Sequence, residues 1–223
     1  MKKRLLYFDC GGGASGDMTL AAMLDLGLSV QSLTRELGKL KVRGFQLKAS
    51  RASRSGIRGT RLRVETPNDR GYRHFSEFTR VIEASRLSDS VKARSLELIR
   101  RVFAAEARVH GKRVDTVHLH ELGSLDTLVD VVGAVIGLEL LGVSDVAASP
   151  VNVGGGQVRT EHGLMPVPAP ATTLLLKGVP VFSDGSQFER TTPTGAVLVS
   201  GLGGWIPSML AARHDPAEIL REE

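Results

Sequence analysis

A long apolar segment at residues 124–141 is the feature that most constrains how this chain can fold. Its length predicts a helix that ends at Gly142, since glycine readily takes the left-handed conformation that closes a helix. Asp130 interrupts the apolar run, and a buried carboxylate is costly unless it is paired or binds a metal. Charges interrupt this and every other apolar run, so no membrane span is expected.

Strands alternate with helices along the rest of the chain. We expect strands at 4–9, 146–153 and 179–183, and helices at 17–26, 29–38, 75–86, 89–110, 168–177 and 193–202. Residues 45–49 and 61–64 alternate apolar and polar side chains, which predicts a half-exposed antiparallel ribbon. The expected fold is therefore α/β, a mixed sheet flanked by helices with a two-stranded antiparallel excursion around 45–66. One domain is expected over 1–207, and 208–223 would be a tail or the start of a missing C-terminal domain.

Composition limits the function. The formal charge of +5 is modest and spread out, which favours a small anionic ligand rather than nucleic acid. The single cysteine, Cys10, excludes an internal disulfide. The apolar run after the basic N-terminus stops at Asp9, too early for a signal peptide, so a cytoplasmic location is expected.

The densest polar cluster runs from His118 to Asp130. On a strand, His118 and His120 would share a face, and on the following helix Asp126 and Asp130 would share another. Imidazole and carboxylate ligands suit a borderline divalent ion such as nickel, zinc or cobalt. The alternative is that the histidines lie on the surface and that Asp126 is a helix N-terminal charge.

Three glycine-rich turns offer close approach to the backbone, at residues 9–17, 153–163 and 191–196. Asp9 and Asp17 in the first would suit a cation better than a phosphate. Taken alone, the first and third turns are explained as helix starts, with Thr192 as a helix cap. His162, flanked by glycine in the second turn, is a candidate ligand or acid–base group.

Other residues have simpler explanations. His110 fits a favourable charge at a helix C-terminus. Cys10 is either a small buried residue or a soft metal ligand. The arginines of the ribbon are expected to form its solvated face, with anion binding as the alternative; they are Arg51, Arg54, Arg58, Arg61 and Arg63.

Taken in order, several short motifs resemble the nickel-inserting chelatase (LarC) family of the lactate racemase cofactor pathway. They are Tyr7-Phe8-Asp9-Cys10, Ser15-Gly16-Asp17-Met18, Val109-His110-Gly111, His118-Leu119-His120-Glu121-Leu122-Gly123-Ser124-Leu125-Asp126, Ala148-Ser149-Pro150, His162-Gly163, Pro166-Val167-Pro168-Ala169-Pro170-Ala171-Thr172 and Thr192-Pro193-Thr194-Gly195-Ala196. The sequence departs from the family pattern in having only His74 between 67 and 75, where full-length members often carry a His-rich loop. It also has Gly12 where serine is expected.

The resemblance implies that this chain is similar to the N-terminal module of a protein that inserts nickel into pyridinium-3,5-bisthiocarboxylic acid mononucleotide. It implies a nickel chelatase of the lyase class that forms nickel–carbon and nickel–sulfur bonds. It also implies that the family's CTP site, with Mn or Mg, belongs to the C-terminal part, in cis or in trans, so inactivity of the fragment alone is compatible with the resemblance. Neither a membrane nor a nucleic acid is expected as a partner, and a homo-oligomer is possible.

The site expected from these residues has three groups. The metal ligands would be His118, His120 and Asp126, together with Asp9 and Asp17. The precursor would contact Gly13, Ser15, Gly155, Thr194 and Gly195. His162 and Glu121 would act in catalysis, with His162 or a carboxylate removing a ring proton. The alternatives are a non-catalytic nickel or precursor carrier and a metal-dependent hydrolase that uses the same residues.

Overall fold

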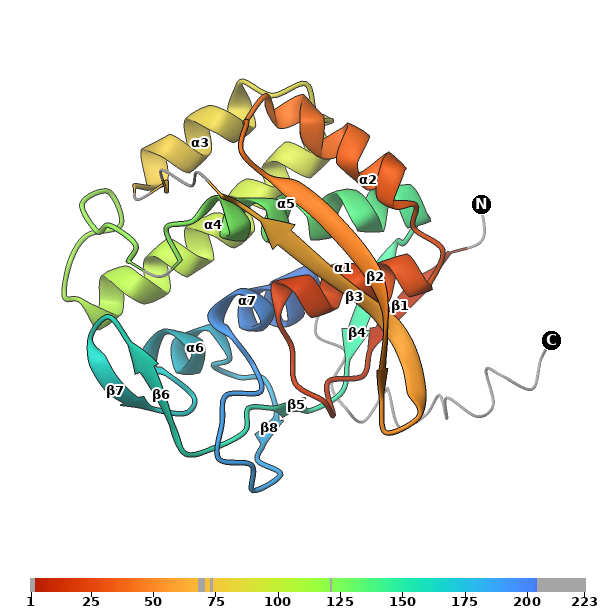
Figure 1. The fold of residues 1–223 in the computed structure, drawn as a ribbon. Helices are drawn as coiled ribbons and strands as arrows, with labels where there is room; N and C mark the ends of the chain where they lie inside the picture. Colours follow the sequence, from red (N-terminus) through yellow and green to blue (C-terminus); the bar gives the residue numbers. More distant parts are fainter. Residues whose placement is uncertain (1–2, 68–70, 73, 121, 204–223) are drawn as a thin grey trace.

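The computed structural model describes residues 3–67, 71–72, 74–120 and 122–203 (Figure 1). Within these residues the helices are α1 (Gly16–Asp25), α2 (Val30–Leu37), α3 (Phe75–Glu83), α4 (Asp89–Val109), α5 (Leu125–Leu141), α6 (Pro170–Leu175) and α7 (Pro193–Leu202). The strands are β1 (Leu5–Phe8), β2 (Gln46–Arg54), β3 (Ile57–Glu65), β4 (Asp145–Ala148), β5 (Val151–Asn152), β6 (Gln157–Thr160), β7 (Gly163–Pro166) and β8 (Val181–Phe182).

Helix α5 forms the centre of the molecule, as its apolar sequence predicts. Every residue from Thr127 to Leu138 is buried, and helices α1, α2, α4 and α7 pack around it (Figure 1). Gly137 lets α1 approach closely, since a Cβ there would lie 2.5 Å from the sulfur of Met23. Each fully buried aliphatic side chain in this core contributes about 1.5–3 kcal/mol.

The β-structure consists of four separate strand pairs in the described residues. β1 pairs with β4 and β5 pairs with β8, both parallel, while β2–β3 and β6–β7 are antiparallel. The predicted α/β class is therefore confirmed, with parallel and antiparallel pairs among the helices. The β2–β3 ribbon, expected from alternation alone, crosses the front of the molecule over α1 (Figure 1).

Two local differences from the predicted elements have physical reasons. The strand expected at 146–153 divides into β4 and β5 at Ser149-Pro150, because proline lacks the N–H that a ladder needs. The β6–β7 hairpin lies in a stretch predicted as a loop. Its two strands have only four residues each, too few for a clear alternation.

No helix in the described part of the chain is both long enough and apolar enough to cross a bilayer. The domain boundary expected near residue 207 lies outside the described residues, so that division stays a prediction.

Candidate metal centre

Four histidines from three segments meet at one end of α4. His110 caps the C-terminus of α4, His118 and His120 lie in the segment before α5, and His162 lies between β6 and β7. Ring centroids are 4.6 Å apart for His118–His120, 4.8 Å for His120–His162, 5.0 Å for His110–His162 and 5.5 Å for His110–His120. His110, His120 and His162 each offer one nitrogen, and the three nitrogens lie within 4.8 Å of one another.

The expected placement of His118 and His120 is confirmed in part. Residues 117–120 form no strand, yet Val117 and Leu119 are buried while His118 and His120 are half-buried. An extended segment alternates its side chains even without a ladder partner. Both imidazoles therefore lie on the same side of the segment.

Glu106 completes this group, which we call the histidine cluster. It lies one turn before His110 on α4, and its Oε2 is 3.3 Å from His110 Nε2. Burial raises the pKa of Glu106, and the nearby charges of His110, His162 and His120 oppose the shift. The His120 Nδ1 atom is buried and has no hydrogen-bond partner in the structure, which leaves one ring nitrogen open to a ligand.

The cavity at the histidine cluster is small. It has a volume of about 70 Å³, and Glu106, His110, His120 and His162 line it together with apolar side chains such as Leu122 and Met165. A water molecule takes up about 30 Å³ of liquid. The cavity therefore has room for an ion with one or two waters, but a nucleotide would have to bind at its mouth.

Sequence reasoning missed two members of this cluster. The sequence alone explains His110 as a helix C-terminal charge and gives Glu106 no role. The signal was present, because a carboxylate and an imidazole four residues apart share one face of a helix.

The predicted carboxylate ligands lie elsewhere. Asp17 and Asp126 stand in the first turns of α1 and α5, and their charges act on Asp130. Within the described chain, the group of side chains close enough to share an ion contains none of them. Asp9 lies in the turn after β1, where its Oδ1 accepts a hydrogen bond of 3.0 Å from Gly11 N–H. Glu121 lies outside the described residues.

Asp130 is a buried acid in a protein interior that disfavours its charge. Only 4% of the residue is exposed, and its Oδ1 has no hydrogen-bond partner in the structure. Burial, followed by the charges of Asp126 and Asp17, raises its pKa to about 9. Its carboxyl packs against Gly16, where a Cβ would lie 1.9 Å from Oδ2. The glycine at the start of α1 is therefore needed to make room for Asp130.

The glycines predicted to bind the precursor lie against other backbone atoms of the chain. A Cβ on Gly13 would lie 2.1 Å from the Arg190 carbonyl oxygen, and one on Gly195 would lie 2.0 Å from that of Ala14. Gly155 likewise faces a backbone carbonyl at 2.9 Å. Their lack of a side chain is thus explained by backbone contacts.

The hydroxyl groups of the two helix starts act mainly as caps. Ser15 accepts from Met18 N–H at 3.3 Å and donates to the Asp17 carboxylate. Thr192 caps α7 by accepting from Gly195 N–H at 3.2 Å, and Thr194 is buried. The helix-start explanation of these two turns is therefore the one that the structure supports.

Cys10 is buried at the end of β1. Burial, with the Asp9 charge adding to it, raises the pKa of the thiol to about 11, although the contact with Ser149 lowers it. A thiol with this pKa stays protonated near neutral pH, which makes Cys10 a poor soft ligand.

Comparison with known proteins decides the family. The nickel insertion protein family matches residues 6–213. The chain belongs to this family. A relative from Syntrophobacter fumaroxidans, whose name assigns it provisionally to nickel insertion, is 49% identical over 207 residues, which is 92% of this chain and 53% of the relative. A relative from Desulfitobacterium hafniense, named as a pyridinium-3,5-bisthiocarboxylic acid mononucleotide nickel insertion protein, is 44% identical over 194 residues, 87% of this chain and 48% of the relative.

The chain spans about half the length of the curated relatives it matches. No solved structure matches it. The match to the nickel insertion protein family confirms the family resemblance expected from the ordered motifs.

Proposed function

We propose that this chain holds the nickel ion that is inserted into pyridinium-3,5-bisthiocarboxylic acid mononucleotide, the compound in the name of the Desulfitobacterium hafniense relative. The observation that carries the proposal is the convergence of His110, His120 and His162 on one small cavity. Imidazole is a good ligand for nickel, a borderline ion. Here nickel is the cargo of the reaction.

The geometry suits an ion that must leave again. Two nitrogens that each lie about 2.1 Å from the same ion are roughly 3–3.5 Å from each other. The three histidine nitrogens here lie up to 4.8 Å from one another. Binding therefore requires a side chain to move inward, and His162 is the exposed one. Three ligands also leave positions open for sulfur atoms of the precursor, as at metal sites that react.

His118 lies beside the three ligands, and we propose that it supports the ring of His120. A nickel–carbon bond forms only if the pyridinium ring loses a proton. Glu106, with its raised pKa, is the group placed to accept it while His162 binds the ion, and His162 can accept it only before it binds nickel. The roles proposed for Asp9, Asp17 and Asp126 as ligands lose support, because these residues lie outside the histidine cluster. The catalytic role of Glu121 stays a prediction, because Glu121 lies outside the described residues.

The part of the reaction that needs a nucleotide belongs, in this proposal, to the other half of the relatives. CTP with Mn or Mg would bind there, in cis or in trans. This chain alone would then bind nickel without completing the insertion.

Calorimetric titration of nickel into the purified chain tests the proposal. We expect binding near a ratio of one ion per chain, with affinity lost or reduced by about tenfold or more in His120→Ala and His110→Ala. His74→Asn is the matched control, because His74 lies 6.2 Å from His118 but outside the ligand group. Equal affinity in all variants would contradict the proposal.

Binding of nickel without any turnover, even when the other half of a relative is added, would favour the alternative of a carrier. Hydrolysis of phosphate esters with manganese or zinc would favour the alternative of a hydrolase.

A further inference from the structure

One face of the β2–β3 ribbon is fixed to the body of the molecule, and the other is free. On the inner face, Leu47 and Leu62 are buried, and Asp25 of α1 accepts hydrogen bonds of 2.8 Å from Thr60 N–H and 2.6 Å from the Thr60 hydroxyl. Because side chains alternate along a strand, the residues between them point to the outer face. The ribbon is therefore a rigid platform with one exposed surface.

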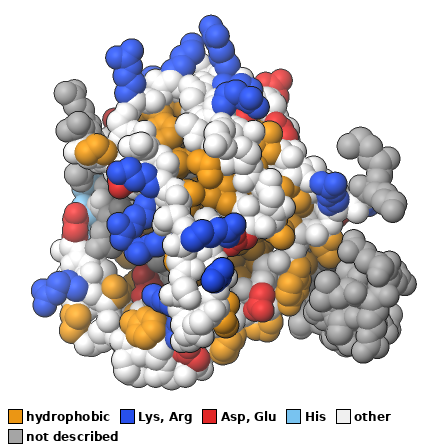
Figure 2. Space-filling view, turned by 45° about the vertical axis from the view of Figure 1, so that its right-hand side comes forward, with side chains coloured by type: hydrophobic (Ala, Val, Ile, Leu, Met, Phe, Trp, Pro, Cys, Tyr) orange, Lys and Arg blue, Asp and Glu red, His pale blue; other side chains and the backbone are white. Residues whose placement is uncertain are grey.

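This part of the chain is strongly basic. Residues 38–64 contain no Asp or Glu, and they contain the nine cations Lys39, Lys41, Arg43, Lys48, Arg51, Arg54, Arg58, Arg61 and Arg63. Lys39, Lys48 and Arg51 form ion pairs with acids outside the segment. The remaining six form none within the described part of the chain. Figure 2 shows basic side chains gathered on this side of the molecule, with few acidic ones between them.

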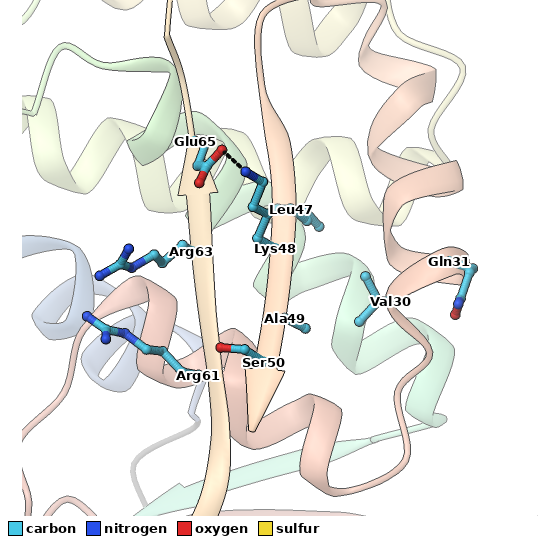
Figure 3. A pocket seen from close by; sticks show the side chains of 9 residues that line it. All are labelled: Val30, Gln31, Leu47, Lys48, Ala49, Ser50, Arg61, Arg63 and Glu65. Carbon is cyan, nitrogen blue, oxygen red and sulfur yellow. Dashed lines mark ion pairs between the residues drawn. The ribbon is translucent and has the colours of Figure 1, made fainter. Parts of the chain in front are cut away.

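The outer face brings like charges together. Lys48 lies opposite Arg63 and Ser50 lies opposite Arg61 in the register of the ribbon. Like charges directly opposite each other are destabilising. Glu65 relieves only one of them, by pairing with Lys48 at 2.7 Å. Figure 3 shows this pair, with Arg61 and Arg63 projecting from β3 in the same direction.

These residues line an open groove of about 670 Å³, together with Val30, Gln31, Leu47 and Ala49. Its ionised side chains are three cations and one carboxylate, a net charge of +2. The volume lies within the range of about 300–1,000 Å³ that is typical of small-molecule sites. The groove therefore has the size and the charge for a small polyanion.

We propose that this groove binds a phosphate-bearing small molecule, with Arg61 and Arg63 donating to its phosphate oxygens. Successive residues on one face of a strand lie about 7 Å apart, so two long side chains that point the same way can reach one phosphate group. Guanidinium groups bind phosphate in a bidentate manner. The Ser50 hydroxyl, opposite Arg61, supplies a further donor.

A purely protective role explains this face less well. Natural edge strands use charged side chains to prevent aggregation. Positive and negative side chains in alternation would do this without the repulsion between neighbouring cations. A segment with nine cations and no acid instead lowers its free energy when it binds an anion. The proposal goes beyond nickel binding and does not rest on it, because the groove shares no lining residue with the histidine cluster.

Calorimetric titrations of the whole chain without nickel test the proposal, with inorganic pyrophosphate and cytidine monophosphate as probes. We expect saturable binding that weakens as salt rises and that weakens by about tenfold or more in Arg61→Gln/Arg63→Gln. Similar affinities for the two probes would identify the ligand as a phosphate group, and tighter binding of the monophosphate would identify a nucleotide.

Arg159→Gln is the matched control, because Arg159 is an exposed strand arginine on the other hairpin. Urea unfolding of each variant checks that the fold is retained. The proposal is overturned if neither probe binds, or if Arg159→Gln weakens binding as much as the double variant does.

Discussion

Replacing Asp130 by asparagine should stabilise the protein at neutral pH. The folded pKa is about 9, whereas an exposed aspartate has a pKa near 4. Between these values the unfolded chain carries an ionised Asp130 and the folded chain a protonated one. The stabilising contribution of the protonated group is complete below the unfolded pKa and is lost as pH rises through the folded pKa.

Each pH unit in this window lowers the free energy of unfolding by about 1.4 kcal/mol through this residue. Between pH 5 and pH 7 the wild-type chain should therefore lose about 3 kcal/mol that Asp130→Asn does not lose. The asparagine keeps the shape of the neutral acid against Gly16 and does not titrate.

Urea unfolding followed by circular dichroism at pH 5, 6 and 7 measures this difference. Histidines also titrate in this range, so the quantity to compare is wild type minus variant. Asp115→Asn is the control, because the Asp115 side chain is 72% exposed. The reasoning is refuted if wild type and Asp130→Asn show the same dependence on pH.

Three further predictions concern the buried framework. Gly195→Ala should lower the free energy of unfolding by about 3 kcal/mol or abolish folding. The new Cβ would lie 2.0 Å from the Ala14 carbonyl oxygen, which belongs to the backbone and cannot rotate away. An unchanged urea midpoint would contradict this. Asn152→Ala removes the hydrogen bonds of a buried side chain, among them 2.9 Å to the Gly11 carbonyl oxygen and 3.0 Å from Gly154 N–H, and should cost about 2–5 kcal/mol in the same assay. A loss below 1 kcal/mol, about the net worth of a single bond, would contradict this. Cys10 should react with a thiol reagent at pH 8 only when the chain unfolds, since it is 2% exposed with a thiol pKa of about 11; rapid reaction of the native chain would contradict its burial.

The helices of this fold were predictable because their signals are local. Residues 124–141 are mainly apolar and are followed by Gly142, and the helix observed there is α5. The cap at Thr192 with Pro193 after it marks the start of α7 in the same way. The strands β6 and β7 were not predicted, because each has only four residues and they form by pairing with each other.

The candidate site was predictable only in part, for a related reason. His118 and His120 are close in sequence, and their shared side follows from local geometry. Their approach to His110 depends on how α4 packs, and their approach to His162 depends on the β6–β7 hairpin. Asp17 and Asp126 are likewise separated from the histidines by packing. The first turns of α1 and α5, which carry these two residues, lie near Asp130 and not near the histidine cluster. Residue type identified the chemistry, but packing decided which residues meet.

The most direct test of the account is anomalous diffraction at the nickel absorption edge, from crystals of this chain soaked with nickel. The account predicts a single strong peak about 2.1 Å from nitrogens of His110, His120 and His162, with the His162 ring moved inward. A peak among Asp17, Asp126 and Asp130, with none at the histidine cluster, would contradict the central claim and return the nickel to the carboxylates.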